Sequence, residues 1–363
     1  MNFSDRYSRQ INLNGFGSAA QQKLQNAKVL VVGAGGLGVP ALQYLAGMGV
    51  GTIGIVDGDS VSLTNLNRQI LYYESEVGKR KAEVAAMKLS QQNPSITIKS
   101  FPFFLTIENA IEIIQQFDLV IDATDNFGAR YLINDACVLL NKPFIYGAIQ
   151  HYEGHVSVFN FKDGPTYRCL YPDFPSADEI PDCNTAGVLG VVPGMIGCQQ
   201  ALEAIKVITG IGKTAAGFLR IFDLLNNDQY DVKLKAKSEN KRIKSLQQNY
   251  LAQTCSNIPL LHTDQLFTWL TENKPFLLLD VREQQEYDQA HLQKSILKPL
   301  SDWKENLSFD EHLPVVTYCQ KGSRSLQAAQ ALRKNNEAVE VYSLAGGMDE
   351  WLKKLGNKLV IHD

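Results

Sequence analysis

The stretch from Val29 to Asp59 constrains the fold of this chain more than any other part of the sequence. It opens with a Val-rich apolar run, which leads directly into Gly33-Ala34-Gly35-Gly36-Leu37-Gly38. Helical spacing follows from Pro40 to Met48, and a second apolar run then ends at Asp57. This order predicts a strand, a glycine turn, a helix and a second strand with an acid at its tip.

Such a turn favours a nucleotide, because glycines let phosphates approach the backbone and the N–H groups and helix dipole attract negative charge. The candidate phosphate-binding residues are Gly33, Gly35, Gly36 and Gly38, and the Asp57 carboxylate can accept hydrogen bonds from a ribose. The alternative is a glycine turn that only permits close packing of helix against sheet. NAD is the usual ligand of this fingerprint, so the remaining sequence has to decide which nucleotide binds.

The composition is that of a soluble globular protein, with 45% apolar and 20% charged residues. A length of 363 residues predicts two or three domains. The net charge of −3 gives no reason to expect nucleic-acid binding, and no apolar run approaches the ~20 residues of a membrane span. The six cysteines are scattered, which predicts reduced thiols in a cytoplasmic protein.

A second acid follows another predicted strand. The run from Asp118 to Asn126 predicts a buried parallel strand that enters a polar turn. Ligands of open parallel sheets lie beyond the carboxyl ends of the strands, where Asp57 and Asp125 are both expected, and two acids near a triphosphate could bind magnesium. The alternative is that Asp122 or Asp125 only caps the next helix.

The remaining elements of this first part follow the same patterns. Residues 61–69 predict a polar loop beside the glycine turn, and 76–91 predict a helix with Lys79 and Lys88 on a solvated face. Further expectations are strands over 96–101, 143–149, 154–161 (antiparallel) and 217–223, helices over 107–116, 128–140 and within 187–209, and a long loop over 167–184 that contains Cys183.

The last hundred or so residues repeat an α/β pattern after a charged, polar stretch. An apolar strand over 314–318 runs into Cys319-Gln-Lys-Gly-Ser-Arg-Ser, where a helix begins. Backbone N–H groups, the helix dipole and Arg324 would all favour a thiolate at this position, which makes Cys319 a candidate nucleophile. An inert buried thiol is the alternative, and the polar neighbours of Cys319 disfavour it.

Residues 1–235 resemble the MoeB/ThiF family, bacterial relatives of the ubiquitin-activating enzymes. The resemblance rests on the blocks RYSRQI, VLVVGAGGLG, VDGDSVSLTNLNRQ, VGKRKAE, DLVIDATDNFGARYLINDAC, CNTAGVLG and QALEAIK, in this order. It implies that ATP, not NAD, is the nucleotide. It also implies adenylation of the C-terminal Gly-Gly of a ubiquitin-like sulfur carrier protein.

The resemblance assigns roles to individual residues. It places Gly36 against the phosphates and Asp57 on the ribose, and it directs Asp125 with Asn126 toward Mg²⁺ and the attacking carboxylate. The residues implied to line the triphosphate are Thr64, Asn65, Asn67, Arg68 and Lys81. Arg9 resembles an arginine that reaches into the partner subunit's site, which implies a homodimer. Such cations suit a carboxylate that attacks an α-phosphate, because both reactants are negatively charged.

One departure from the family concerns zinc. Members that bind zinc carry two Cys-x-x-Cys pairs, whereas this chain reads Thr166-Tyr167-Arg168-Cys169 and lacks the second pair around 236–240. A structural zinc site needs four ligands. No structural zinc is therefore expected, and Cys169 is expected to be an ordinary buried thiol.

Residues 259–363 resemble a single rhodanese domain. The matching blocks are Leu279-Asp280-Val281-Arg282-Glu283 with Glu286 and His291, the loop from Cys319 to Ser325, and Gly346-Gly347 with Trp351. Four residues separate Cys319 from Arg324, whereas cysteine phosphatases have five there. The resemblance implies that Cys319 carries a persulfide.

Together these features predict an α/β protein. A Rossmann-like ATP-binding domain with a mixed, mostly parallel sheet would span 1–235. A linker over 236–258 and a smaller α/β rhodanese domain over 259–363 would follow it.

The expected function is adenylation of a MoaD-like or ThiS-like carrier, followed by sulfur transfer from Cys319 to give a thiocarboxylate for molybdenum cofactor or thiamine synthesis. The sulfur donor would be a cysteine desulfurase or thiosulfate, and Cys183 would act as the resolving thiol or only pack its loop. The alternatives are a non-catalytic sulfur relay or scaffold, an activating enzyme with an idle rhodanese domain, and an NAD-binding oxidoreductase.

Overall fold

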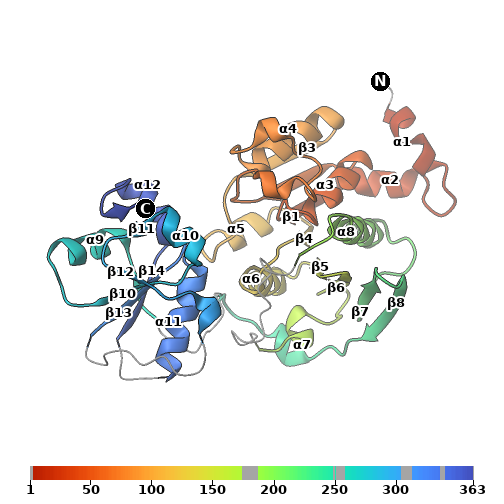
Figure 1. Ribbon diagram of the computed structural model, residues 1–363. Coiled ribbons are helices and arrows are strands. Elements are labelled where there is room, and N and C mark those ends of the chain that lie inside the picture. The colour runs from red at the N-terminus through yellow and green to blue at the C-terminus, as the bar shows by residue number, and fades with distance from the viewer. Residues whose placement is uncertain are drawn as a thin grey trace. The chain divides into compact units, whose positions relative to one another are not determined.

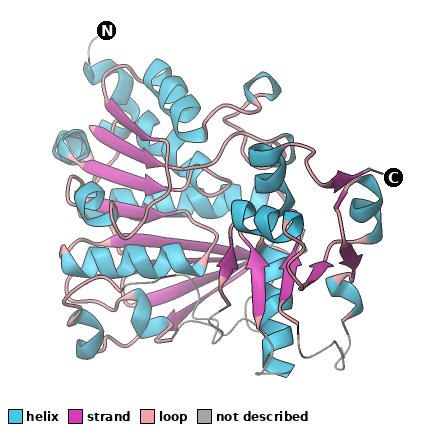
Figure 2. Ribbon diagram, turned by 90° about the vertical axis from the view of Figure 1, so that its left-hand side faces the viewer, coloured by secondary structure: helices cyan, strands magenta, loops and turns pink. Residues whose placement is uncertain are grey.

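The chain forms two compact units, residues 1–252 and 253–363, in a computed structural model (Figures 1 and 2). The structure describes residues 3–173, 187–247, 250, 258–303, 313–335 and 340–362. Across these ranges no helix has both the length and the apolar character needed to cross a membrane.

An eight-stranded sheet in the order β3-β2-β1-β4-β5-β6-β7-β8 forms the centre of the first unit. Its strands are β1 (Lys28–Val32), β2 (Thr52–Val56), β3 (Thr97–Phe101), β4 (Leu119–Asp122), β5 (Phe144–Gln150), β6 (Glu153–Phe159), β7 (Phe218–Asp223) and β8 (Asp228–Lys233). The strands from β3 to β5 run parallel, and β6, β7 and β8 each pair antiparallel. The predicted mixed, mostly parallel sheet is confirmed. Strand β8 was not predicted because all six of its residues are exposed, so it lacks an apolar pattern.

Helices cover both faces of this sheet (Figure 2). They are α1 (Phe3–Ile11), α2 (Gly17–Asn26), α3 (Gly38–Gly47), α4 (Lys81–Gln92), α5 (Ala110–Ile114), α6 (Phe127–Leu139), α7 (Tyr167–Leu170) and α8 (Val191–Thr209), with 3-10 turns η1 (Leu63–Asn65), η2 (Glu74–Glu76) and η4 (Ser238–Lys241). Alternate residues of β1 face opposite ways. Val29 and Val31 belong to the core that includes α3 and α8, whereas Leu30 and Val32 belong to the core that includes α5 and α6.

The expectation that Lys88 lies on a solvated face is wrong. Its side chain is 13% exposed, and Nζ bonds Glu76 Oε2 at 2.7 Å and lies 3.3 Å from the Tyr73 ring centroid. Lys79 is exposed, as expected. Helix α4 begins at Lys81, five residues later than predicted. The reason is that Glu76 belongs to the preceding 3-10 turn, where its carboxylate accepts a hydrogen bond from Tyr73 N.

The second unit has a five-stranded, all-parallel sheet in the order β12-β10-β13-β14-β9 and a small antiparallel pair of β11 and β15. The strands are β9 (Leu260–Leu261), β10 (Leu277–Asp280), β11 (His291–Leu292), β12 (Ser295–Leu297), β13 (Val315–Tyr318), β14 (Val341–Leu344) and β15 (Val360–Ile361). The helices are α9 (Thr263–Thr271), α10 (Gln284–Gln289), α11 (Ser323–Asn335) and α12 (Gly347–Leu355), with the 3-10 turn η5 (Leu300–Asp302). Apolar cores on the two sheet faces include residues of α9 and α12 on one side and of α11 on the other.

Part of the predicted linker packs against the first unit. The Lys237 N–H donates to Cys169 Sγ at 3.3 Å, and Tyr250, which is 5% exposed, donates its hydroxyl to Asp135 Oδ2 at 2.8 Å. These contacts are polar, so they leave no apolar periodicity in the sequence. The domain boundaries near 235 and 258 stay predictions.

Candidate functional site

The glycine turn joins the carboxyl ends of three strands. Gly33 has a φ of +98°, its N–H donates to Val56 O at 2.8 Å, and a Cβ there would lie 2.6 Å from Ala123 O. A Cβ on Gly38 would lie 1.8 Å from Gly33 O. Both positions therefore require glycine. The expected strand–turn–helix is confirmed.

The other two glycines of the turn face different neighbours. A Cβ on Gly36 would lie 3.1 Å from Pro193 Cβ of α8 and 3.6 Å from Arg68 Cγ. A Cβ on Gly35 would lie 3.6 Å from Gln69 Nε2. Leu37, the residue before α3, makes no side-chain capping bond, and Val39 N donates to Gly35 O at 2.9 Å. The N–H groups at the start of a helix suit an anion.

Asp57 holds the glycine turn in place. Its Oδ2 accepts from Ala34 N at 2.7 Å, and its Oδ1 accepts from Asp59 N at 2.8 Å. Burial raises the pKa of Asp57 above its usual range, although these two N–H groups lower it. Tyr72, which sequence reasoning missed, donates its hydroxyl to Ala34 O at 2.8 Å. The acceptor capacity of Asp57 is partly used inside the protein, and its remaining lone pairs suit a ribose hydroxyl.

The predicted polar loop lies beside this turn. Residues Leu63–Asn65 form η1, and the half-buried Arg68 donates to Thr64 O at 2.9 Å and to Asn67 Oδ1 at 3.1 Å. These bonds orient the guanidinium, whose stem approaches Gly36. A fixed arginine at the phosphate turn suits a triphosphate, because guanidinium matches phosphate geometry.

Lys81 is the first residue of α4 and is only 5% exposed. Its Nζ bonds Asp59 Oδ2 at 3.1 Å, and the Asp59 side chain is 56% exposed. This ion pair fixes the Lys81 ammonium group next to Asp59, two residues after Asp57. No cluster of three or more His, Cys, Asp or Glu side chains that could bind a metal occurs in the described ranges.

Asp125 lies just beyond β4 and is exposed. Among the described residues it has no hydrogen-bond or ion-pair partner, so its carboxylate is available to a ligand. Magnesium needs only one or two protein carboxylates when phosphates supply further oxygens, so Asp125 fits this ion. The alternative that Asp122 or Asp125 caps the next helix is wrong, because Asn126 Oδ1 accepts from Ala129 N at 2.9 Å and caps α6.

Two predicted residues of the first unit remain, Arg9 and Cys183. Arg9 lies in the last turn of α1 and is exposed. Cys183 lies outside the described residues.

Cys169 differs from the ordinary buried thiol that was expected. It is only partly buried, and its Sγ accepts hydrogen bonds from Thr166 N at 3.4 Å, Lys237 N at 3.3 Å and Asn240 Nδ2 at 3.6 Å. Burial raises the pKa of this thiol, but the bonds from Thr166, Lys237 and Asn240 outweigh it, so the pKa falls below the ordinary cysteine value. These hydrogen bonds link the two segments in which zinc-binding family members carry their cysteine pairs.

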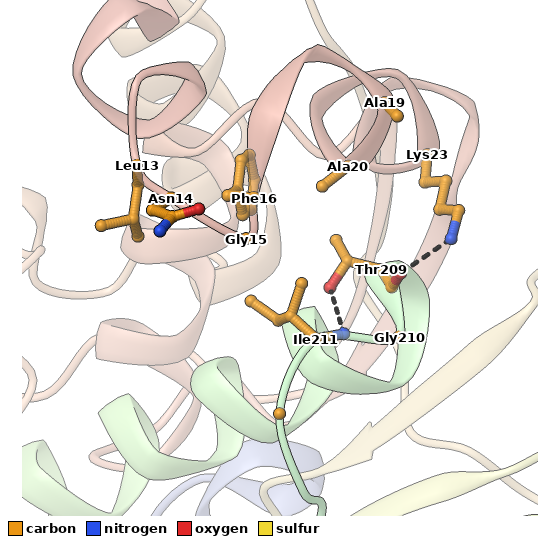
Figure 3. A pocket seen from close by; sticks show the side chains of 11 residues that line it. Leu13, Asn14, Gly15, Phe16, Ala19, Ala20, Lys23, Thr209, Gly210 and Ile211 are labelled. Atoms are coloured by element: carbon orange, nitrogen blue, oxygen red, sulfur yellow. Dashed lines mark hydrogen bonds between the residues drawn. The ribbon is translucent and has the colours of Figure 1, made fainter.

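A hollow of about 550 Å³ lies between α2 and the C-terminal end of α8 (Figure 3). Lys23 Nζ donates to Thr209 O at 2.8 Å on its rim. Thr209 is sixteen residues from Pro193, or about 24 Å along the helix, so the hollow is remote from the glycine turn.

In the second unit, Cys319 follows β13 and lies inside the loop that leads into α11. The Cys319 residue is 1% exposed, and its Sγ accepts from Gly322 N at 3.1 Å and contacts Ser325 Oγ at 3.7 Å. Gly322 has a φ of +95°, which the tight loop requires. A Cβ on Gly347 would lie 2.2 Å from Cys319 O. A backbone N–H donor such as that of Gly322 suits an anionic sulfur species at Cys319.

Arg324 forms a two-point ion pair with Glu286 of α10, with NH1–Oε2 and NH2–Oε1 both at 2.7 Å. The two side chains are each 32% exposed. Hydrogen bonding from Arg324 lowers the pKa of Glu286, and hydrogen bonding to Glu286 raises the pKa of Arg324. The Arg324 guanidinium is thus bonded to Glu286 at the start of α11. That Arg324 also favours a thiolate at Cys319 stays a prediction.

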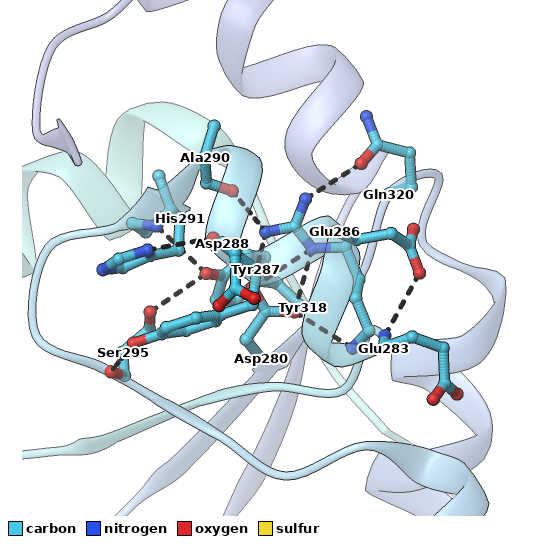
Figure 4. A network of polar contacts seen from close by, with 12 residues as sticks. Asp280, Glu283, Glu286, Tyr287, Asp288, Ala290, His291, Ser295, Tyr318 and Gln320 are labelled. Atoms are coloured by element: carbon cyan, nitrogen blue, oxygen red, sulfur yellow. Dashed lines mark hydrogen bonds and ion pairs between the residues drawn. The ribbon is translucent and has the colours of Figure 1, made fainter. Parts of the chain in front are cut away.

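A buried ion pair supports this loop. Arg282 bonds Asp280 Oδ2 at 2.6 Å, and the two side chains are 3% and 0% exposed. Arg282 also donates to Ala290 O at 2.6 Å and to Gln320 Oε1 at 3.0 Å, next to Cys319 (Figure 4). The Asp-Val-Arg block is therefore structural support for the cysteine loop.

The fold and the two sites define a protein with a nucleotide-binding α/β unit and a sulfurtransferase-type cysteine unit. Residues 7–243 match the ThiF family model, and residues 263–354 match the rhodanese-like domain model. The chain belongs to the ThiF family and carries a rhodanese-like domain. It is an adenylyltransferase and sulfurtransferase.

Relatives match almost the whole chain. A probable molybdopterin-synthase adenylyltransferase of Porphyra purpurea is 39% identical, over 97% of this chain and 94% of its own length. The adenylyltransferase and sulfurtransferase MOCS3 of Drosophila sechellia is 39% identical, over 98% and 84%, and that of Danio rerio is 37% identical, over 96% and 85%.

Solved structures share the fold of the first unit. E. coli MccB in a crystal structure with ATP has a TM-score of 0.56 and 24% identity, over 64% of this chain and 72% of its own. Another crystal structure of E. coli MccB gives a TM-score of 0.58 and 22% identity, over 72% and 75%.

Proposed function

We propose that the chain uses ATP to adenylate the C-terminal glycine of a ubiquitin-like sulfur carrier ending in Gly-Gly, and then converts that carboxylate to a thiocarboxylate with sulfur from Cys319. One observation carries the proposal. A single chain combines a glycine turn flanked by Arg68, Lys81 and Asp125 with a cysteine loop that encloses Cys319. An NAD enzyme has no need of these cations, and a passive relay has no need of the glycine turn.

In the first step the carrier carboxylate attacks the α-phosphate of ATP and pyrophosphate leaves. Backbone N–H groups of the turn and the first turn of α3 would bind phosphate oxygens, with Asp57 on the ribose. Thr64, Asn65 and Asn67 would line the triphosphate beside Arg68. Asp125, next to Asn126, would hold Mg²⁺, which neutralises part of the phosphate charge when bound.

In the second step a persulfide on Cys319 attacks the acyl-adenylate. The terminal sulfur bonds to the acyl carbon and AMP leaves, which gives an acyl disulfide. A thiol then attacks the Cys319 sulfur, which breaks the S–S bond, releases the thiocarboxylate and leaves Cys319 in a disulfide with that thiol. Cys183 is the proposed resolving thiol. Backbone N–H groups and Arg324 would stabilise the anionic sulfur species during these exchanges.

The proposal also covers the partners. The carrier is MoaD-like or ThiS-like, and the naming of one relative as a molybdopterin-synthase adenylyltransferase supports the molybdenum route. The sulfur comes from a cysteine desulfurase or thiosulfate. No structural zinc takes part.

A homodimer, with Arg9 reaching the partner's nucleotide site, completes the proposal, and the exposure of Arg9 on α1 supports it. Mixing two inactive variants, Arg9→Ala and Asp125→Ala, tests the role in trans. Mixed dimers contain one intact site, so activity should reappear on mixing. If the mixture stays as inactive as its components, Arg9 does not act in trans.

Carrier-dependent ATP–pyrophosphate exchange tests the first step. Exchange should be lost in Arg68→Ala and Asp125→Ala and retained in Cys319→Ala. Asp118→Asn, an exposed acid at the other end of β4, is the matched control and should keep wild-type exchange. Absence of exchange in the wild type with both carriers would contradict the proposal and favour a relay or scaffold. Tight NAD binding with indifference to ATP would favour an oxidoreductase.

A further inference from the structure

Three side chains fix the backbone of the turn that carries Asp125. Asp122 Oδ1 accepts from Thr124 N at 3.0 Å and from Thr124 Oγ1 at 2.6 Å. Arg130 NH2 donates to Thr124 O at 3.2 Å, and Gln200 Nε2 donates to Asp122 O at 2.6 Å. The peptide groups on either side of Thr124 are thus both bonded, immediately before Asp125.

These three side chains come from different elements, namely β4, α6 and α8. Asp122 and Gln200 are 0% exposed and Arg130 is 9% exposed. Arg130 also lies over the rings of Phe127 and Tyr146, at 5.4 and 5.5 Å from their centroids. A guanidinium packed in this way has little freedom, so the turn is tied to the sheet and to two helices at once.

The sequence provides space for Gln200. A Cβ on Gly147 of β5 would lie 2.3 Å from Gln200 Cδ, so a larger residue there would displace the amide from Asp122 O. Glycine in the middle of a strand normally weakens it. Its presence here indicates that the position of Gln200 matters more than the local strand preference.

The arrangement of charges does not follow from stability alone. Asp122 and Arg130 are both buried, and burial raises the pKa of Asp122, yet no ion pair within 4.0 Å joins the two among the described residues, and Asp122 Oδ2 and Arg130 Nε have no hydrogen-bond partner there. A buried pair that served stability would be expected to bond directly, because desolvation of two charges is costly. Arg130 instead directs NH2 to the carbonyl next to Asp125.

We propose that Arg130, Asp122 and Gln200 are positioning residues that hold the Thr124–Asn126 turn so that Asp125 meets the metal–nucleotide complex. The inference rests on the adenylation function proposed above. Asp125 is exposed and bonds no described residue, so the backbone of the turn sets where its short side chain can reach. Displacement of a reacting group by about 1 Å can cost about 100-fold in rate.

The experiment uses the full chain with Gln200→Leu, Arg130→Lys and Thr124→Ala, of which the last removes only one hydroxyl bond. Electron paramagnetic resonance would measure Mn²⁺ binding in the presence of a non-hydrolysable ATP analogue, and pyrophosphate exchange would be titrated with Mg²⁺. Folded variants should bind Mn²⁺ about tenfold more weakly and require about tenfold more Mg²⁺. Sulfur transfer from thiosulfate to cyanide by the rhodanese unit should not change.

Arg168→Gln is the matched control. Arg168 is partly buried and bonds Asp135 of α6 at 2.7 Å, and none of its bonds to the described residues reaches the Thr124–Asn126 turn. It should lower the melting temperature and leave Mn²⁺ binding unchanged. Wild-type Mn²⁺ affinity in the folded turn variants, or an equal loss in Arg168→Gln, would overturn the inference. If the wild type binds Mn²⁺ but shows no ATP–pyrophosphate exchange, the proposed adenylation function is contradicted. The comparison of Mn²⁺ affinity between the wild type and the turn variants would still decide the inference about the positioning residues.

Discussion

Asp280→Asn should destabilise the rhodanese unit strongly, because it leaves the Arg282 charge buried without its counter-ion. The side chains of this pair are 0% and 3% exposed, and Arg282 Nε and NH2 both bond the Asp280 carboxylate, at distances from 2.6 to 3.1 Å. Removal of one partner of such a buried pair costs about 3–5 kcal/mol. With a urea slope of about 2 kcal/mol/M, the midpoint should fall by about 2 M.

Tryptophan fluorescence measures this transition selectively. All three tryptophans, Trp269, Trp303 and Trp351, belong to residues 253–363, so their emission reports unfolding of that unit alone. Lys354→Gln is the control. The side chains of Lys354 and its ion-pair partner Glu350 are 42% and 31% exposed, so this pair should contribute less than about 1 kcal/mol to the free energy of unfolding. If Asp280→Asn lost no more stability than Lys354→Gln, the buried pair would not support the cysteine loop as described.

Four further outcomes are expected. Cys169 should be alkylated at lower pH than Cys198, because hydrogen bonds lower the pKa of Cys169 whereas burial raises the pKa of Cys198. Mass spectrometry of the labelled peptides measures both reactions in one sample. Elemental analysis of the purified protein should find no zinc. Gly38→Ala should destabilise the first unit by about 1–3 kcal/mol in thermal unfolding, since a Cβ there would meet a backbone carbonyl at 1.8 Å. The pKa of Glu286 is lowered in the folded state by its hydrogen bonds to Arg324. The Glu286 carboxylate therefore stabilises the fold fully at pH values above the usual glutamate pKa, and this stabilisation is lost as the pH falls through the lowered pKa. Glu286→Gln should therefore flatten the acid side of the stability profile measured by tryptophan emission.

Most elements could be predicted because their apolar patterns are strong. Strand β2 occupies the predicted residues 52–56, and the antiparallel pairing of β6 was expected from its alternation. Strand β8 was not predictable in this way, because its exposed residues carry no apolar period, and Tyr250 is a single buried residue within a largely polar stretch. Lys88 was misassigned because a sequence does not show that a ring and a carboxylate converge on one ammonium group.

Sequence reasoning located the strand ends at which the site forms but not the bonds that support it. The motif around Asp125 was recognised, and Arg130 and Gln200 stand in recognised blocks, but their bonds to the turn were not predicted, because the two residues lie on separate helices and meet only after folding. Likewise, Glu286 was part of a recognised block, but its two bonds to Arg324 depend on the approach of α10 to the cysteine loop. Neither pairing has a local sequence signal.

The most direct test of the account is the intact mass of the carrier after reaction. Purified MoaD-like and ThiS-like carriers from the same source would each be incubated with the protein, ATP, Mg²⁺ and thiosulfate. One carrier should gain the mass of sulfur in place of oxygen, and Asp125→Ala or Cys319→Ala should each abolish that gain. A carrier that gains the sulfur equally well with Cys319→Ala would contradict the two-site mechanism, because adenylation alone would then suffice.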